Sequence, residues 1–293
     1  MKEPFLYYQV KNHKNADPSR FDTSAPEGFN KKTAALLLAE SKLRLADYQE
    51  RLYAGRERAL LIIFQAMDAA GKDSAVKHVM SGMNPQGTTV RSFKQPSAVE
   101  YDHDFLWRHV LALPERGQIG IHNRSHYESV LVCKVHPELV LKENLPGIKT
   151  TGDVNKAFWK ARYAQIRNFE QHLHENGTTV LKFFLNVSPE VQKERLLERI
   201  EDPTKNWKFA AGDIEERRHW SDYMKAYRAA LAETSTPDCP WYMIPADKKW
   251  FARLAISYIL EETLKKMDPR FPVLPESDQA GLASSRNALL SEK

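Results

Sequence analysis

The chain has 293 residues, of which 42% are hydrophobic and 28% are charged, so it is long enough to bury a sizeable core. Its 43 Lys and Arg outnumber its 38 Asp and Glu, which gives a formal net charge of +5. This composition excludes fibrous, collagen-like and mostly disordered proteins, and the small positive excess allows a polyanionic partner if the basic residues cluster.

The sequence lacks the marks of disulfide-rich, metal-finger and membrane proteins. Its two cysteines, Cys133 and Cys239, cannot form a disulfide framework and do not have the spacing of metal ligands. The apolar run 59–64 is far shorter than the roughly 20 residues that cross a bilayer. Residues 1–15 contain no apolar signal-peptide core. We therefore expect a cytoplasmic protein with no membrane association.

The two ends of the chain differ from its centre. Residues 1–30 are rich in Pro, Asn, Lys and Ser without a hydrophobic period, so we expect an extended N-terminal arm. The segment 31–54 has apolar residues at helical spacing and is followed by Gly55, which predicts a helix. Its predicted apolar stripe consists of Leu38, Leu45, Tyr48 and Leu52. Residues 269–293 are rich in Ser, Glu and Ala and are expected to form a loosely held tail.

Between these ends, residues 31–268 are expected to form one catalytic domain. From residue 59 onward, short apolar runs alternate with longer amphipathic segments. The predicted strands are 59–65, 88–93, 118–122, 180–187 and 241–245, and the helical segments that follow them lie near 73–82, 97–112, 155–176, 188–200, 213–232 and 248–266. This alternation predicts a three-layer α/β/α fold with about five parallel strands, covered on both faces.

The first predicted strand leads directly into a candidate phosphate-binding loop. Strand, tight loop, Gly71-Lys72 and helix follow one another in the order that a P-loop requires. Backbone N–H groups of the loop and the start of the helix can surround a phosphate, and Lys72 adds a positive charge. The predicted phosphate contacts are Ala69, Ala70, Gly71, Asp73 and Ser74. The alternative is a chance Gly-Lys pair in a strand-to-helix turn.

Two acidic residues distinguish this loop from the usual pattern, which has Ser or Thr after the lysine. A carboxylate at Asp68 would repel phosphate unless a cation lay between them, so Asp68 is a candidate Mg²⁺ ligand. Asp73 adds a second negative charge beside the phosphate, or is simply a favourable charge in the first turn of a helix. Ser74 could supply a hydroxyl one position later.

A second group of polar residues follows the strand predicted at 118–122. Ligands of parallel α/β sheets bind beyond the carboxyl ends of the strands, so Asn123 and Arg124 are candidate site residues. The planar guanidinium of Arg124 suits a phosphate group, and the alternative is a solvated turn. Lys94 follows the strand predicted at 88–93 and is expected at the same edge.

Five co-linear motifs over residues 32–268 together resemble the polyphosphate kinase 2 family. They are AMDAAGKDSAVKHVMSGMNPQG, SFKQPSAVEYDHDFLWRH, IGIHNRSHYESVLVCKVHPE, RIEDPTKNWKFAAGD and PWYMIPADKKWFARL. The resemblance implies a P-loop kinase core similar to thymidylate kinase, with a helical lid at about 188–213. It also implies phosphoryl transfer between inorganic polyphosphate and nucleotides with Mg²⁺, or with Mn²⁺ in its place.

The resemblance assigns roles position by position. Asp68 resembles the family's essential, metal-binding loop aspartate, and Lys72 its loop lysine. Asn123 and Arg124 fall on a motif that is usually Asp-Arg; Asn here, with Glu128 close behind, resembles the class III subgroup, which accepts both AMP and ADP. Met67 departs from the Arg often found at its position.

Further contacts follow from the same resemblance. Arg195, Arg199 and Lys208 are implied phosphate contacts of the lid. Asp104 and Arg108 are expected to face the acceptor nucleotide, together with Asn123, Arg124 and Glu128. Trp207, also in the lid, suits either packing or stacking on a base.

We therefore predict a polyphosphate-dependent nucleotide phosphotransferase that converts AMP or ADP reversibly. Adenine nucleotides are the expected acceptors, guanine nucleotides are further candidates, and the chain is expected to form homodimers or homotetramers. One alternative is an ATP-dependent nucleoside monophosphate kinase of the thymidylate kinase type. A second is a non-catalytic, nucleic-acid-binding P-loop protein, which the modest net charge disfavours. We expect no nucleic-acid partner.

Overall fold

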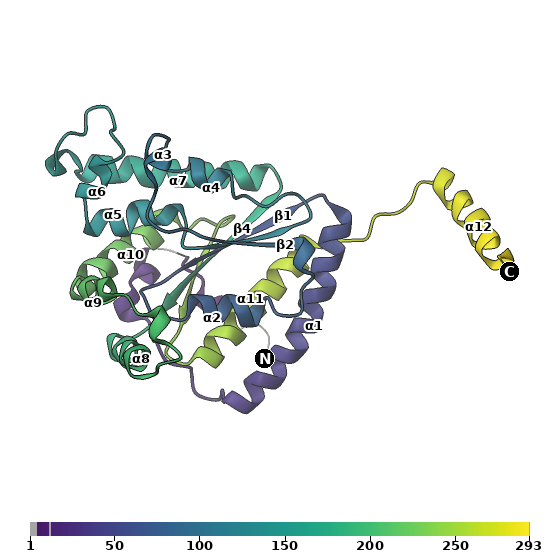
Figure 1. Ribbon diagram of the computed structural model, residues 1–293, viewed down its shortest axis with the longest axis horizontal. Helices are drawn as coiled ribbons and strands as arrows, with labels where there is room; N and C mark the ends of the chain where they lie inside the picture. Colours follow the sequence, from purple (N-terminus) through teal and green to yellow (C-terminus); the bar gives the residue numbers. More distant parts are fainter. Residues whose placement is uncertain (1–4, 12, 293) are drawn as a thin grey trace.

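One sheet of five parallel strands is the centre of the computed structural model, which describes residues 5–11 and 13–292 (Figure 1). The strands are β1 (Ala59–Gln65), β2 (Thr88–Ser92), β3 (Ile119–Asn123), β4 (Thr178–Asn186) and β5 (Trp241–Pro245). Their order is β2-β3-β1-β4-β5, and every neighbouring pair is parallel. The predicted strands and the α/β fold are confirmed, and β1 lies at the middle of the sheet.

Helices cover both faces of this sheet. The helices are α1 (Lys31–Gly55), α2 (Lys72–Val79), α3 (Ala98–Tyr101), α4 (Trp107–Val110), α5 (Val132–Val135), α6 (Glu138–Leu141), α7 (Lys156–Glu175), α8 (Pro189–Glu201), α9 (Ala211–Arg218), α10 (Trp220–Thr234), α11 (Lys249–Met267) and α12 (Glu276–Ser291). Helices α1, α2 and α11 pack together on one side of the sheet, and α7 and α10 pack together on the other (Figure 1). The three layers follow from this arrangement.

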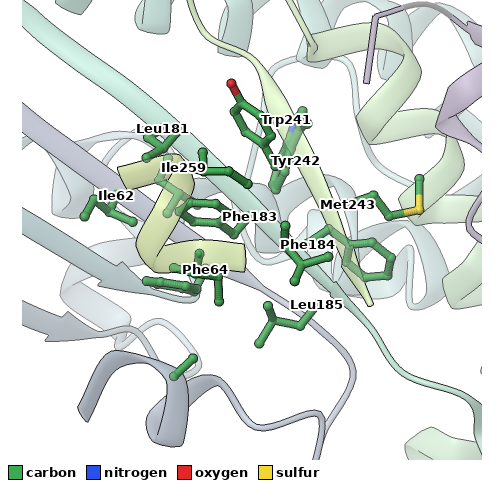
Figure 2. Close-up of a cluster of buried hydrophobic side chains, with 14 of the residues drawn as sticks. Ile62, Phe64, Leu181, Phe183, Phe184, Leu185, Trp241, Tyr242, Met243 and Ile259 are labelled. Atoms are coloured by element: carbon green, nitrogen blue, oxygen red, sulfur yellow. The ribbon is translucent and has the colours of Figure 1, made fainter. Parts of the chain in front are cut away.

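Buried hydrophobic side chains of β1, β4 and β5 form a cluster in the core (Figure 2). The rings of Phe64 and Phe183 stack with their centroids 5.3 Å apart. Neighbouring residues of a strand point to opposite faces, so Phe184 lies on the other face, where its ring is 4.2 Å from that of Tyr227 in α10. The mainly apolar composition of β4 therefore reflects a strand that is buried on both sides.

The helix predicted over 31–54 is α1, and its buried face is more polar than the sequence suggested. Asn30 begins it, because its side chain accepts a hydrogen bond from the N–H of Thr33. Leu45 and Leu52 are buried as predicted, whereas Leu38 and Tyr48 are half-buried. Ser41, Gln49 and Ala34 complete the buried face, and the Ser41 hydroxyl binds Ser257 and Glu261 of α11.

The two terminal segments behave differently. The described part of 1–30 forms three single 3-10 turns, η1 (Leu6–Tyr8), η2 (His13–Ala16) and η3 (Pro18–Arg20), instead of an extended run, and Phe5, Tyr8, Val10 and Ala16 are buried in the core. Such turns are too short to give a periodic pattern. At the other end, α12 stands away from the body, and its described side chains are exposed (Figure 1). The division into arm, catalytic domain and tail stays a prediction.

The segment expected to form a lid, 188–213, contains α8, the 3-10 turn η7 (Asn206–Lys208) and the start of α9. A single helix was predicted over 213–232, but the chain breaks at His219 between α9 and α10. Within residues 5–11 and 13–292, no helix combines the length and the apolar composition that a bilayer span needs.

Candidate active site

The candidate phosphate-binding loop joins β1 to α2 at the middle of the sheet edge. Gly71 and Ala69 have the positive φ angles of 109° and 58° that fold the loop back on itself. The Lys72 ammonium is buried under the loop and donates to the carbonyl oxygens of Ala66 (2.8 Å) and Met67 (3.4 Å). Since an ammonium has three N–H groups, one remains for a phosphate oxygen. Burial lowers the pKa of Lys72, and the Asp68 carboxylate opposes that shift.

The structure brings the two predicted groups of polar residues together. The Arg124 guanidinium at the end of β3 donates to the Asp68 carboxylate at 2.8 Å. Arg124 has a φ of 63°, a left-handed conformation that is costly for a residue with a side chain. The Asn123 amide donates to Asp73 at 2.6 Å. Without ligand, each loop acid is therefore paired with a residue of the β3 end.

Two predicted phosphate contacts are engaged with protein groups instead. Arg195 of α8 is only 8% exposed, and its guanidinium donates to four backbone carbonyl oxygens at 2.8–3.2 Å. Those oxygens belong to Ala69, Ala70, Ala246 and Asp247. The Ser74 hydroxyl accepts from Arg253 of α11 at 2.6 Å. Arg195 thus positions the loop against the turn that follows β5.

A cavity of about 650 Å³, here called the loop cavity, opens over this loop. Loop residues 68–74, the ends of β2 and β3, the lid and Lys249 line it. Its lining includes eight cationic and four acidic side chains. The cations are Lys72, Lys94, Arg124, Arg195, Arg199, Lys205, Lys208 and Lys249, and the acids are Asp68, Asp73, Glu198 and Asp213. The excess of positive charge suits a polyanion.

Three of these cations are available to a ligand. Arg199 is paired with Asp213 at 3.0 Å, and Lys205 with Glu198 at 2.7 Å. In the described part of the chain, no carboxylate lies within salt-bridge distance of Lys94, Lys208 or Lys249. These lysines belong to the β2 end, the lid and the start of α11, so they approach the cavity from three elements.

Sequence reasoning missed Asp213 and Lys249, although both lie in the motifs that carried the family resemblance. Burial raises the pKa of Asp213, and the nearby Asp68 carboxylate raises it further, while Arg199 opposes the shift. Asp213 therefore faces the same space as Asp68. In the sequence, Asp213 is visible only as an acidic residue at the end of the lid motif, and the sequence does not show where its side chain points.

A second cavity of about 400 Å³, here called the outer cavity, lies between α3–α4 and the segment after β3. Asp104, Arg108 and Glu128 all line it, and their contact with an acceptor stays a prediction. The Arg108 guanidinium donates a hydrogen bond to the Lys94 carbonyl oxygen at 2.8 Å and lies over the Phe93 ring. Burial raises the pKa of Glu128, and the charges of Arg124 and Lys72 offset only part of that rise.

Beneath the outer cavity is a buried polar cluster that the sequence did not reveal. Lys182 of β4 forms an ion pair with Glu170 of α7 and donates to the Tyr127 hydroxyl at 3.0 Å. Tyr127 donates to Glu170 at 2.7 Å, and the Thr234 carbonyl oxygen accepts from Lys182 at 2.8 Å. Burial alone would raise the pKa of Glu170, but the Lys182 ammonium holds it below its usual value. Tyr127 precedes Glu128, so this cluster, called the floor cluster, anchors the turn that presents Glu128.

The donor set fits a divalent cation that arrives with phosphate. Among the described residues, no group of three His, Cys, Asp or Glu side chains is arranged to hold a metal ion. Mg²⁺ in phosphoryl-transfer sites is commonly held by one or two carboxylates and by the phosphates of the substrate, with water in the remaining positions. Asp68, which is partly exposed beside the loop cavity, suits that role.

The five-stranded order, the loop between β1 and α2 and the helical lid define a kinase of the P-loop class. Residues 29–272 match the family model described as Polyphosphate kinase 2. The chain belongs to the polyphosphate kinase 2 family, whose members are phosphotransferases. The resemblance drawn from the five motifs is thereby confirmed.

Individual relatives agree with this assignment. The chain is 46% identical to the ADP-polyphosphate phosphotransferase of Rhodopseudomonas palustris, over 99% of this chain and 100% of the relative. It is 45% identical to the AMP/ADP-polyphosphate phosphotransferase of Meiothermus ruber, over 88% of this chain and 90% of the relative. The crystal structure of Polyphosphate Kinase 2 from Arthrobacter aurescens TC1 superposes with a TM-score of 0.80 at 39% identity, covering 91% and 92% of the two chains.

Proposed function

We propose that this protein transfers the terminal phosphoryl group of inorganic polyphosphate to AMP and ADP, forming ADP and ATP, in a reversible reaction that uses Mg²⁺. One observation carries the proposal: the loop cavity and the outer cavity share Lys94 and Arg124. A donor in one cavity and an acceptor in the other would meet at these two cations. Phosphoryl transfer needs this arrangement, because it depends on positioning and on offsetting negative charge.

The loop cavity suits the polyphosphate donor. Polyphosphate carries a negative charge at every phosphate, and Lys94, Lys208 and Lys249 present positive charge from three elements, with no acid partner among the residues that the structure describes. The free N–H groups of the loop and the start of α2 favour the terminal phosphate. Lys156 and Lys160 of α7, which are exposed and basic, line neither cavity, so we leave them outside the donor path.

The outer cavity suits the nucleotide acceptor. It combines cationic side chains with aromatic and apolar ones, as a nucleotide requires, and Arg124 lies where its phosphate would enter the loop cavity. The names of two relatives indicate acceptance of ADP in one and of both AMP and ADP in the other. Asn123 together with Glu128 supports acceptance of both nucleotides here, and guanine nucleotides are further candidates.

The reaction is an in-line displacement. A terminal phosphate oxygen of the acceptor forms a bond to the end phosphorus of polyphosphate, and the bridging P–O bond breaks as the shortened chain leaves with the electron pair. Arg124 and Lys72 stabilise the charge on the oxygens of the transferred group. When bound, Mg²⁺ held by Asp68 would offset phosphate charge, and Mn²⁺ would accept the same oxygen ligands. No covalent enzyme intermediate is needed.

A panel of donors and acceptors tests the proposal. AMP, ADP, GMP and GDP are each incubated with polyphosphate as the only donor, with and without Mg²⁺, and the products are separated by anion-exchange chromatography. We expect ADP and ATP from the adenine acceptors, with no product after chelation of divalent cations. Product formation that is indifferent to polyphosphate would refute the proposed donor.

We also propose that the chain assembles through α1 into a homodimer or homotetramer. Leu36 and Leu43 of this helix are exposed although both are large and apolar. Light scattering after size-exclusion chromatography checks this, and replacing both leucines with lysine is expected to shift the mass to that of one chain.

A further inference from the structure

The lid places two aromatic side chains in the loop cavity that a polyphosphate chain cannot use. Trp207 is 79% exposed and Phe209 is 41% exposed, and both line the cavity with the phosphate-binding loop. Polyphosphate offers only charged oxygens, so it gains little from contact with an indole or phenyl ring. Two exposed aromatic side chains in the lining of one cavity form an apolar surface that an aromatic or apolar group of a ligand could cover.

The indole of Trp207 is oriented by its neighbours and does not pack in the core. Its ring N–H donates to the Thr204 carbonyl oxygen at 3.1 Å, which fixes one edge of the ring. The Lys208 ammonium lies 4.9 Å from the ring centroid. Trp207 therefore does not pack in the core of this chain, and its ring lies beside the Lys208 ammonium, which has no carboxylate within salt-bridge distance among the described residues.

A nucleoside triphosphate has the two parts that this cavity can bind. Its phosphates would lie on the loop beside Lys72, and its base would stack on Trp207, because every nucleobase presents a flat π surface to an aromatic side chain. Lys208 and Lys249 line the same cavity as the aromatic side chains and the loop, and they would neutralise the phosphate chain.

We propose that the loop cavity also accepts a nucleoside triphosphate as donor, with its base stacked on Trp207, so that the protein transfers the γ-phosphoryl group of ATP to AMP. This rests on the proposed function, because the acceptor still occupies the outer cavity. The AMP phosphate oxygen forms a bond to Pγ, the bond from Pγ to the β,γ-bridging oxygen breaks, and ADP leaves with the electron pair. The products are two molecules of ADP, and no further reactant is needed.

The first experiment asks whether ATP replaces polyphosphate. Protein freed of polyphosphate by an exopolyphosphatase is incubated with ATP, AMP and Mg²⁺, and ADP is measured by chromatography. Asp68→Asn protein purified in parallel reports any contaminating kinase. We expect ADP from the wild-type chain and not from Asp68→Asn. Because stacking does not read the edges of the base, GTP should serve as donor to a similar extent.

The second experiment asks whether Trp207 holds the base. In Trp207→Ala we expect the ratio of kcat/KM with ATP as donor to kcat/KM with polyphosphate as donor to fall about tenfold, as loss of one stacking contact predicts. Trp207→Phe should keep most of that ratio. Tyr7→Ala is the matched control, because Tyr7 is also an exposed aromatic residue, at 75%, and lies outside the loop cavity. At saturating AMP, the β,γ-imido analogue of ATP should inhibit competitively against polyphosphate.

The outcomes separate this inference from the proposed function. If polyphosphate supports ATP formation but ATP and AMP give no ADP, the inference is overturned and the proposed function stands. Equal losses with both donors in Trp207→Ala would also overturn it. If the protein transfers a phosphoryl group from ATP but not from polyphosphate, the proposed donor is wrong and the inference stands. If neither donor supports transfer, the proposed function and the inference are both refuted.

Discussion

The floor cluster and the loop cavity treat their charges in opposite ways. In the floor cluster, Lys182, Glu170 and Tyr127 are buried and bind one another. Around the loop cavity, Lys208 and Lys249 have no acid partner within the described residues, and Trp207 is exposed. The charges of the floor cluster are neutralised within the protein, whereas these two cations of the loop cavity are left for the proposed polyphosphate donor to neutralise. The turn that presents Glu128 to the proposed acceptor therefore has a fixed support.

The largest expected effect concerns the stability of the floor cluster. Lys182→Met leaves the Glu170 carboxylate buried without its cation, and we expect the free energy of unfolding to fall by about 4 kcal/mol. Urea denaturation measures this. The double variant Lys182→Met/Glu170→Gln is the control, and it should recover part of the loss because no charge is stranded.

The pH dependence of that variant sharpens the same test. In the wild-type chain Lys182 lowers the pKa of Glu170, so this pair stabilises the fold above the ordinary pKa of glutamate and loses effect as the pH falls. In Lys182→Met, burial raises the pKa of Glu170 instead, so the variant should gain stability from about pH 8 to about pH 5. A variant that loses stability over this range would contradict the assigned pair.

The second prediction concerns catalysis at the loop. Asp68→Asn should lower kcat with polyphosphate by about a hundredfold, or about 2.7 kcal/mol, because it removes the carboxylate proposed to hold the cation. Its melting temperature should change by less than about 2 °C, since the exposed pair with Arg124 adds little stability. Asp73→Asn is the comparison variant. An equal loss there would mean that Asp73 is more than a favourable charge in the first helical turn.

A smaller effect is expected from the unpaired cations of the loop cavity. Lys249→Ala should raise the KM for polyphosphate about tenfold, as loss of one charged hydrogen bond predicts, and leave the KM for AMP within about twofold. Lys266→Ala, an exposed lysine near the other end of α11, is the matched control. If both variants raise the KM equally, the effect comes from net charge and not from the cavity.

The smallest expected effect is on the acceptor side. Glu128 has a raised pKa because of burial, and it faces Arg124, Lys72 and Asp68. As the pH falls through this raised pKa, Glu128 becomes neutral and repels the nucleotide phosphate less, so the KM for AMP should fall about threefold. Glu128→Gln should show the lower KM for AMP at every pH, without the pH-dependent change that Glu128 causes. If the KM still changes with pH in this variant, another titrating group is responsible.

The strands and the loop could be predicted because their information is local. The central strand β1 and the edge strand β5 are short runs of mainly apolar residues, and the residues of the loop, from Asp68 to Ser74, are adjacent in the sequence. The side-chain partners could not be predicted in this way. Arg195 was assigned to phosphate because the family resemblance places it in the lid, whereas the four carbonyl oxygens that it binds belong to two turns far from it in the chain.

The floor cluster shows the same limit. A lysine inside an apolar strand, Lys182, signals a buried partner, but the sequence does not say that Glu170 and Tyr127 supply it. Asp213 and Lys249 were overlooked because, in a segment of mixed charge, the sequence does not show which charged side chains face the cavity. The catalytic roles of the loop residues stay predictions, while their positions around one cavity are observed.

The hydrogen bonds of α8 and α9 have a mechanical consequence for the lid. Gln192 donates to the Asp68 carbonyl oxygen at 3.0 Å and accepts from Arg217 at 2.5 Å, and Glu216 accepts from the Tyr223 hydroxyl at 2.5 Å. The stretch 199–213 therefore lies between two helices that are hydrogen-bonded to each other and to the rest of the protein. Because Gln192 binds the backbone of Asp68 itself, a displacement of α8 would also displace the phosphate-binding loop.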